Sequence, residues 1–144
     1  MPSKSEHLDV ARENVAAMRH LHGAGDRFAR WMTTTVFYAA VHVVEAVFAE
    51  IEGSHSENHH ERNARLRGDR RYRNLWQHYK RLLRESMIAR YLESDHPRAN
   101  VDDFRTAEAV IRELHGHHLK QIVASAGRLI GETIDLEPQD TTAP

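Results

Sequence analysis

The segment "YRNLWQHYK", residues 72–80, combines residue types that can act on a phosphodiester. Arg73 and Asn74 stand five and four positions before His78. A histidine that titrates near neutral pH can remove the proton of an RNA 2′-OH or protonate a leaving 5′-oxygen. A guanidinium donates forked hydrogen bonds to a phosphate and stabilises the charge that grows on it. The segment therefore fits RNA cleavage without a metal, since RNA supplies its own nucleophile.

Helix geometry leaves two candidates for the arginine. Residues five apart on a regular helix lie about 140° from each other, so Arg73 and His78 share a face poorly. Asn74 and His78 do share a face, and Arg71 extends it. The spacing itself is weak evidence. With 17 arginines and 12 histidines, about four pairs in which a histidine follows an arginine after four to six residues are expected by chance. The five pairs present are Arg71 or Arg73 with His78, Arg90 with His96, and Arg112 with His117 or His118. The alternative is that His78 is an ordinary surface histidine.

The charge of the chain is strongly segregated. Ten of the twelve charged residues between positions 62 and 90 are basic, so this segment carries +8 and the remainder −9. Such asymmetry favours a polyanion or an acidic partner, with a second copy of this chain as one possibility. The alternative is a solvated helix whose charges are met by neighbouring helices. The residues expected to contact RNA on this segment are Arg70, Arg71, Asn74, Lys80 and Arg81.

The elements that must position these residues are all expected to be helices. Apolar residues recur with the 3.6-residue period over 6–22, 27–52, 71–93 and 100–135, and no segment alternates as a strand would. A short polar helix is expected over 57–67. Asp26 is a plausible cap for the second helix, and Gly116 or Gly127 could bend the last one. We expect an all-α, four- to five-helix up-and-down bundle over residues 1–135, with a disordered tail over 136–144.

A second polar group lies on the second expected helix. Tyr38 and His42 are one turn apart and Glu45 is close by, off the apolar stripe of that helix. Tyr38 and His42 could line a cleft beside the basic segment and contact RNA. The alternative is a buried histidine that fixes helix packing through a hydrogen bond to a neighbour.

The bundle, together with "VFYAAVHVVEAVF", "SHSENHH" and "RNLWQH", resembles the HEPN superfamily of compact α-helical domains. Many HEPN domains are metal-independent ribonucleases or RNA-binding partners in toxin–antitoxin and defence systems. The resemblance implies an arginine–polar–x3–histidine site, here Arg73, Asn74 and His78, with Tyr38 and His42 as a recurring pair. It also implies a homodimer, and an antitoxin or nucleotidyltransferase as a possible partner.

The other histidines allow a metal hypothesis. Three imidazoles from two helices can hold zinc or nickel in a bundle, and "LHGHHLKQ" is similar to metal-binding bundles of the DinB-like group. The residues concerned are His55, His59, His60, Glu61, His115, His117 and His118. The spacing is loose, however, and the alternative is a solvated histidine face. We therefore assign no metal ligand and expect no cofactor.

Composition excludes several other classes. With no cysteine there is no disulfide framework, and the N-terminus has no apolar signal segment, so a cytoplasmic location is expected. The apolar stretch around residues 36–48 is interrupted by His42 and Glu45, so no membrane association is expected. There is no glycine-rich phosphate loop. The sequence thus predicts an RNA-binding protein that cleaves RNA, or else a non-catalytic HEPN-like binding module or a metal-binding bundle.

Overall fold

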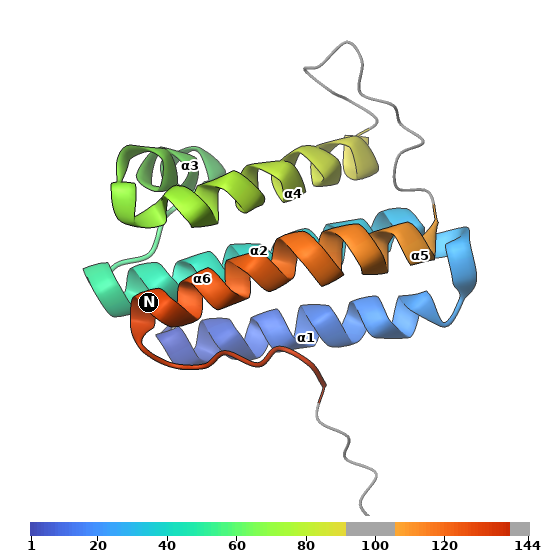
Figure 1. Ribbon diagram of the computed structural model, residues 1–144, viewed down its shortest axis with the longest axis horizontal. Coiled ribbons are helices and arrows are strands. Elements are labelled where there is room, and N and C mark those ends of the chain that lie inside the picture. Colours follow the sequence, from blue (N-terminus) through green and yellow to red (C-terminus); the bar gives the residue numbers. More distant parts are fainter. Residues whose placement is uncertain (92–105, 139–144) are drawn as a thin grey trace, which may run out of the picture.

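A computed structural model describes residues 1–91 and 106–138 of the chain, and this part of the molecule is helical without strands. Four long helical segments run alternately in opposite directions, which confirms the predicted all-α bundle (Figure 1). The elements are α1 (Lys4–His22), η1 (Gly25–Phe28), α2 (Ala29–Glu52), α3 (His59–Gly68), η2 (Arg70–Tyr72), α4 (Arg73–Tyr91), α5 (Ala107–Ala109), η3 (Val110–Leu119) and α6 (Lys120–Ile130). The last three form one continuous helix.

Helix α2 is the central helix of the bundle and contacts α1, α4, η3 and α6. It is buried on almost every side, and Met32, Val36, Phe37 and Phe48 are fully enclosed. A helix that is apolar all round is expected where neighbours cover every face. The extent of this burial exceeds the single apolar stripe that the sequence predicted.

The same helix has a membrane-like composition. By length and hydropathy Gly25–Glu52 could cross a membrane, which we did not expect from the sequence. However, 78% of its most apolar window is buried inside the bundle, and core helices of other proteins share this property. The finding is therefore weak evidence for a membrane span.

Helices α1 and α2 end at His22 and Glu52 as predicted, whereas α1 begins two residues before and α3 two residues after the predicted start. Ser3 caps α1 by accepting a hydrogen bond from the Glu6 amide, and Asn58 caps α3 in the same way. Asp26, which we expected to cap the second helix, instead accepts a hydrogen bond of 2.8 Å from the Ala107 amide. Asp26 therefore links the α1–α2 turn to the beginning of the last helix.

The last helix is not split at Gly116 or Gly127 but continues from Ala107 to Ile130. Between Val110 and Leu119 it widens into a π-helix, in which each amide bonds to the carbonyl five residues earlier. A Cβ atom on Gly116 would lie 2.9 Å from the Ile111 carbonyl oxygen, so a larger residue could not fit without a backbone shift. Gly116 is thus adapted to the wide turn.

The chain after α6 folds back onto the bundle. Leu136 is buried, and Glu137 forms an ion pair with Arg19 of α1 at 2.9 Å. Leu136 and Glu137, which we expected in a disordered tail, therefore contact the bundle, and residues 139–144 lie outside the described part. The Arg90–His96 pair also involves a residue outside the described part, as does Asn100, which the sequence offers as a cap for the last helix.

Candidate active site: a histidine hollow beside helix α4

Three imidazoles from two helices meet beside α4. The Nδ1 atoms of His78 on α4 and His118 on η3 lie 3.1 Å apart, within hydrogen-bond distance. The His117 ring packs against both, with centroids 5.4 Å from His78 and 4.8 Å from His118. One nitrogen from each of the three rings lies within 4.8 Å of the others. A histidine pair 40 positions apart is thus part of one local cluster.

The π-helical stretch explains why adjacent histidines both face α4. Because the i→i+5 pattern places more residues in each turn, consecutive side chains are separated by a smaller rotation than in an α-helix. His117 and His118 therefore reach the same partner, His78. His115, on the same stretch, turns elsewhere and pairs with Glu137 at 2.7 Å. The predicted "HGHH" group is accordingly divided between two surfaces.

The surroundings of the cluster disfavour the charged imidazolium. Burial and the neighbouring His117 lower the pKa of His78 below its usual value. Burial, followed by His117 and His78, lowers the pKa of His118 to about 4. Both rings are therefore neutral near pH 7, when an imidazole can accept a proton or bind a metal.

Basic side chains surround the imidazoles. The cluster lines an open hollow of about 510 Å³, which is also lined by Gln77, Lys80, Arg81 and Arg84. Arg81 is paired with Glu85 at 3.2 Å. No ion pair of Lys80 or Arg84 occurs among residues 1–91 and 106–138. Lys80 and Arg84 thus offer positive charge to an anion in the hollow.

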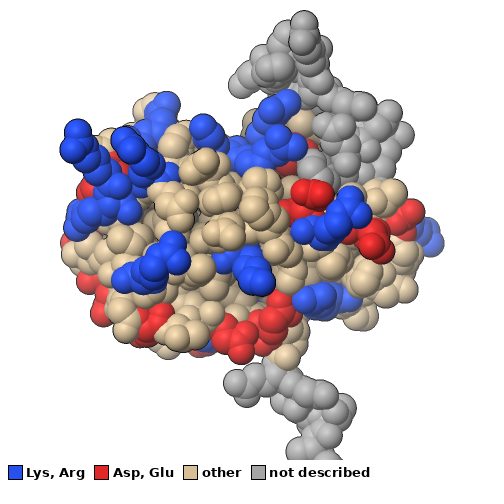
Figure 2. Space-filling view, in the orientation of Figure 1, with Lys and Arg blue, Asp and Glu red and all other residues tan. Residues whose placement is uncertain are grey.

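The basic character extends over one side of the molecule. Figure 2 shows Lys and Arg gathered over the α3–α4 layer, whereas Asp and Glu gather mainly along the opposite edge. Not every basic residue of segment 62–90 contributes, however. Arg62 is buried, and Arg65 pairs with Glu61 at 2.7 Å. The surface charge is therefore smaller than the +8 of the sequence suggests.

The arginines expected at the site do not line this hollow. Arg73 is exposed at the first turn of α4, and Arg71 is paired with Asp69 at 2.7 Å. Arg70 is exposed in η2. Asn74 donates a hydrogen bond to Ser125 of α6 at 3.1 Å, so it connects two helices. Of the predicted site residues, the hollow brings together the catalytic candidate His78 and the RNA-binding candidates Lys80 and Arg81.

Tyr38 and His42 belong to different surroundings. The Tyr38 hydroxyl accepts a hydrogen bond of 2.9 Å from Arg90, whose guanidinium also lies over the Tyr38 ring. The Nδ1 atom of His42 lies 3.1 Å from that of His7 on α1. Neither residue lines the histidine hollow. The contact with His7 is consistent with the alternative stated above, in which His42 fixes the packing of two helices through a hydrogen bond.

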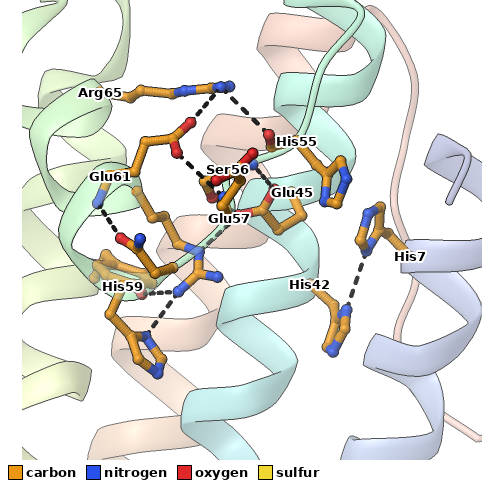
Figure 3. A network of polar contacts seen from close by, with 12 residues as sticks. His7, His42, Glu45, His55, Ser56, Glu57, His59, Glu61 and Arg65 are labelled. Atoms are coloured by element: carbon orange, nitrogen blue, oxygen red, sulfur yellow. Dashed lines mark hydrogen bonds and ion pairs between the residues drawn. The ribbon is translucent and has the colours of Figure 1, made fainter. Parts of the chain in front are cut away.

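A buried ion pair holds α3 against α2. The Arg62 Nε donates to Glu45 at 2.7 Å, and Glu45 also accepts from the amide and the hydroxyl of Ser56 (Figure 3). Arg62 further donates to Nδ1 of His59 at 2.8 Å and to the Tyr79 hydroxyl at 3.4 Å. These contacts offset the burial cost, so that the pKa of Glu45 is lowered overall.

A second group of histidines lies beside this ion pair. His7, Glu45 and His55 each present one polar atom within 4.8 Å of the others, and His42 contacts His7 (Figure 3). His7 is only 5% exposed. Sequence inspection missed His7 because nothing in its local spacing distinguishes it from the other eleven histidines.

Comparisons with protein-family models, with curated proteins and with solved structures find no match to this chain.

Proposed function

We propose that this protein binds RNA along the basic α3–α4 surface and cleaves it in the histidine hollow. The observation that carries the proposal is the 3.1 Å contact between Nδ1 of His78 and Nδ1 of His118, surrounded by Lys80, Arg81 and Arg84. This places two imidazoles and several cations where one phosphodiester could contact them.

The imidazole pair can supply both proton transfers of the reaction. A hydrogen bond between two Nδ1 atoms requires one ring to donate its Nδ1–H, which leaves its Nε2 unprotonated. The accepting ring then carries its proton on Nε2. The first Nε2 takes the proton of the 2′-OH, the Nδ1 proton passes to the second ring, and the second Nε2–H goes to the leaving 5′-oxygen. The P–O2′ bond forms and the P–O5′ bond breaks, giving a cyclic phosphate and a 5′-hydroxyl.

The cations of the hollow would bind the phosphate during this reaction. Lys80 and Arg84 have no carboxylate partner within the described ranges, and Arg81 can share its guanidinium between Glu85 and a phosphate oxygen. Charge that develops on the non-bridging oxygens is stabilised most by donors that are already in place. In this proposal Arg81 and Arg84 take the role that the sequence assigned to Arg73 or Arg71.

The HEPN resemblance remains part of the proposal and is consistent with the helical bundle. A HEPN-like homodimer would join two basic surfaces and lengthen the RNA path. Because one chain supplies both imidazoles here, we expect a monomer to cleave as well. An antitoxin or a nucleotidyltransferase would act by covering or modifying this surface.

The test is cleavage of a fluorescent single-stranded RNA by untagged protein in the presence of EDTA. His78→Ala and His118→Ala should each reduce the rate at least 100-fold, because general acid–base catalysis contributes about 10²–10⁴-fold. His20→Ala, an exposed histidine of α1, is the matched control and should cleave normally. The same oligonucleotide with 2′-O-methyl groups should bind and remain intact.

The results also separate cleavage from binding alone. If RNA binds with steep salt dependence but none is cut, the protein is a non-catalytic binding module. If both His78→Ala and His118→Ala cleave at the normal rate, the hollow is not the catalytic site. Circular dichroism of each variant verifies that the fold is retained.

A second candidate function has its own geometric support. Zinc–imidazole bonds of about 2.0–2.1 Å place two nitrogen ligands of a tetrahedral site roughly 3.3 Å apart, near the His78–His118 separation. With His117 as third ligand, the hollow could bind a divalent metal that activates water. In that case EDTA would abolish activity and stoichiometric metal would restore it, whereas the metal-independent reaction is unaffected by EDTA.

A further inference from the structure

We propose that His7, Glu45 and His55 form a binding site for one divalent transition-metal ion, with zinc as the best match. This site lies between α1, the C-terminal half of α2 and the segment that precedes α3 (Figure 3). It is separate from the histidine hollow and does not depend on the proposed RNA cleavage.

The first observation is a buried nitrogen without a partner. His7 is 5% exposed, and its Nε2 atom is fully buried with no hydrogen bond among the described residues. Its Nδ1 is already engaged with Nδ1 of His42 at 3.1 Å. A buried polar atom without a partner is costly, so native structures usually provide one. A metal ion at Nε2 would provide it.

The second observation is the position of the other ligands. One ligand atom from each of His7, Glu45 and His55 lies within 4.8 Å of the other two. Figure 3 shows the rings of His7 and His55 close to each other beside Glu45. Two imidazoles and one carboxylate are a ligand set typical of zinc. They leave a position for water or a fourth ligand.

Glu45 retains acceptor capacity despite its contacts. A carboxylate offers about four lone-pair positions. The Ser56 hydroxyl and Arg62 Nε bond to Oε1, and the Ser56 amide bonds to Oε2. One position on Oε2 is therefore left for a metal. Arg62 neutralises part of the carboxylate charge, so we expect only moderate affinity.

His42 would orient His7 from outside the site. Metal-bound histidines usually donate their second ring N–H to a nearby acceptor, which fixes the tautomer that binds the metal. If His7 donates Nδ1–H to His42, its Nε2 carries the lone pair that a metal needs. His42→Phe should therefore weaken metal binding without removing a ligand.

The experiment uses the full-length untagged chain carrying His117→Ala and His118→Ala, so that the histidine hollow cannot bind metal. After treatment with EDTA and its removal, Zn²⁺ is titrated calorimetrically and Co²⁺ is followed by its visible absorption. We expect one ion per chain and a higher melting temperature with Zn²⁺, because the ion binds the folded state. His55→Ala should reduce affinity at least tenfold and remove the cobalt spectrum, and His20→Ala should change neither.

His55→Ala is the decisive variant because His55 is half-buried outside the helices, so the fold should be retained. His7→Asn should lose the metal as well, if circular dichroism shows that it folds. The proposal is wrong if the double-variant background takes up no Zn²⁺ or Co²⁺, in which case His7 Nε2 is bonded to buried water. It is also wrong if His55→Ala binds both ions as the background does. Neither result bears on RNA cleavage by the unmodified chain.

Discussion

His78 and His118 are 40 residues apart in the sequence, yet their Nδ1 atoms lie 3.1 Å from each other. The contact connects α4 to the π-helical stretch of the last helix, in a hollow that also exposes basic side chains. The basic residues of the hollow, the His118 imidazole, Gly116 in the wide turn and the buried Arg62–Glu45 pair each have a consequence that can be measured.

The basic side chains of the hollow should control RNA affinity. Changing Lys80 and Arg84 together to alanine should weaken binding of a single-stranded RNA and lower the salt slope of log K by roughly 1.4, at about 0.7 per phosphate contact. Fluorescence anisotropy from 50 to 300 mM salt measures both effects. Arg73→Ala is the comparison, because Arg73 lies outside the hollow. An equal or larger effect of Arg73→Ala would favour Arg73, the arginine suggested by the sequence, as the residue that binds the phosphate.

The Arg62–Glu45 pair should be important for stability. Arg62→Met leaves the Glu45 carboxylate buried without its cation, which should reduce the free energy of unfolding by about 3–5 kcal/mol. Arg65→Met removes a more exposed pair with Glu61 and should cost less than about 1 kcal/mol. Urea denaturation followed by circular dichroism compares the two. Similar losses would show that burial of the Arg62 pair has no special role.

Stability should fall as the solution becomes acidic. The pKa of His118 is lowered from 6.5 to about 4, so between these values the unfolded chain binds a proton that the folded chain does not. The free energy of unfolding is therefore unaffected by the titration of His118 above pH 6.5 and decreases as the pH falls toward 4. We expect a loss of about 1–2 kcal/mol for this partly exposed group. His7, His42 and His78 also have lowered pKa values and act in the same direction.

Urea midpoints between pH 4 and 7.5 measure this loss of stability. His118→Gln removes one titrating group, so its stability should change less steeply with pH than that of the unmodified chain. His20→Gln, on an exposed face of α1, is the control. A midpoint that stays constant from pH 7.5 to pH 5 would contradict the prediction.

The wide turn should depend on Gly116. An alanine Cβ would lie 2.9 Å from the Ile111 carbonyl oxygen, so Gly116→Ala should destabilise the fold by roughly 1–3 kcal/mol. Gly68→Ala is the matched control, because a Cβ there meets nothing within 4 Å. The shift in the backbone should also move His118, so Gly116→Ala should reduce RNA cleavage more than Gly68→Ala does. Equal stability of the two variants would count against this account.

The general fold was accessible from the sequence because helical periodicity is a local property. The apolar stripe of α4 illustrates both success and failure. The 3.6-residue period predicts that α4 buries Leu75, Tyr79, Leu82, Leu83 and Met87. Leu75, Tyr79 and Leu82 are buried. Met87 is 37% exposed, and the buried face continues through Ser86 and Ile88 instead. Periodicity identifies the apolar face of a helix, but the packing of the neighbouring helices determines which residues at the margins of that face are buried.

The candidate site was only partly accessible. His78 was singled out from its neighbours, but its partners His117 and His118 come from a helix whose wide turns no sequence pattern indicated. Arg62 was counted among surface charges, although Glu45 seventeen positions earlier holds it inside the fold. Such pairings depend on which helices pack together, and one sequence provides no direct signal of that.

The π-helical stretch Val110–Leu119 also suggests how such a site can originate. An extra residue inserted into a regular helix can be absorbed as a wider turn, while the turns on either side keep their orientation. Leu114 and Ile122 accordingly remain buried before and after the histidine pair. An insertion of this kind redirects a few side chains toward a neighbouring helix and preserves the packing. A plain structural helix could acquire reactive groups in this way without rebuilding its core.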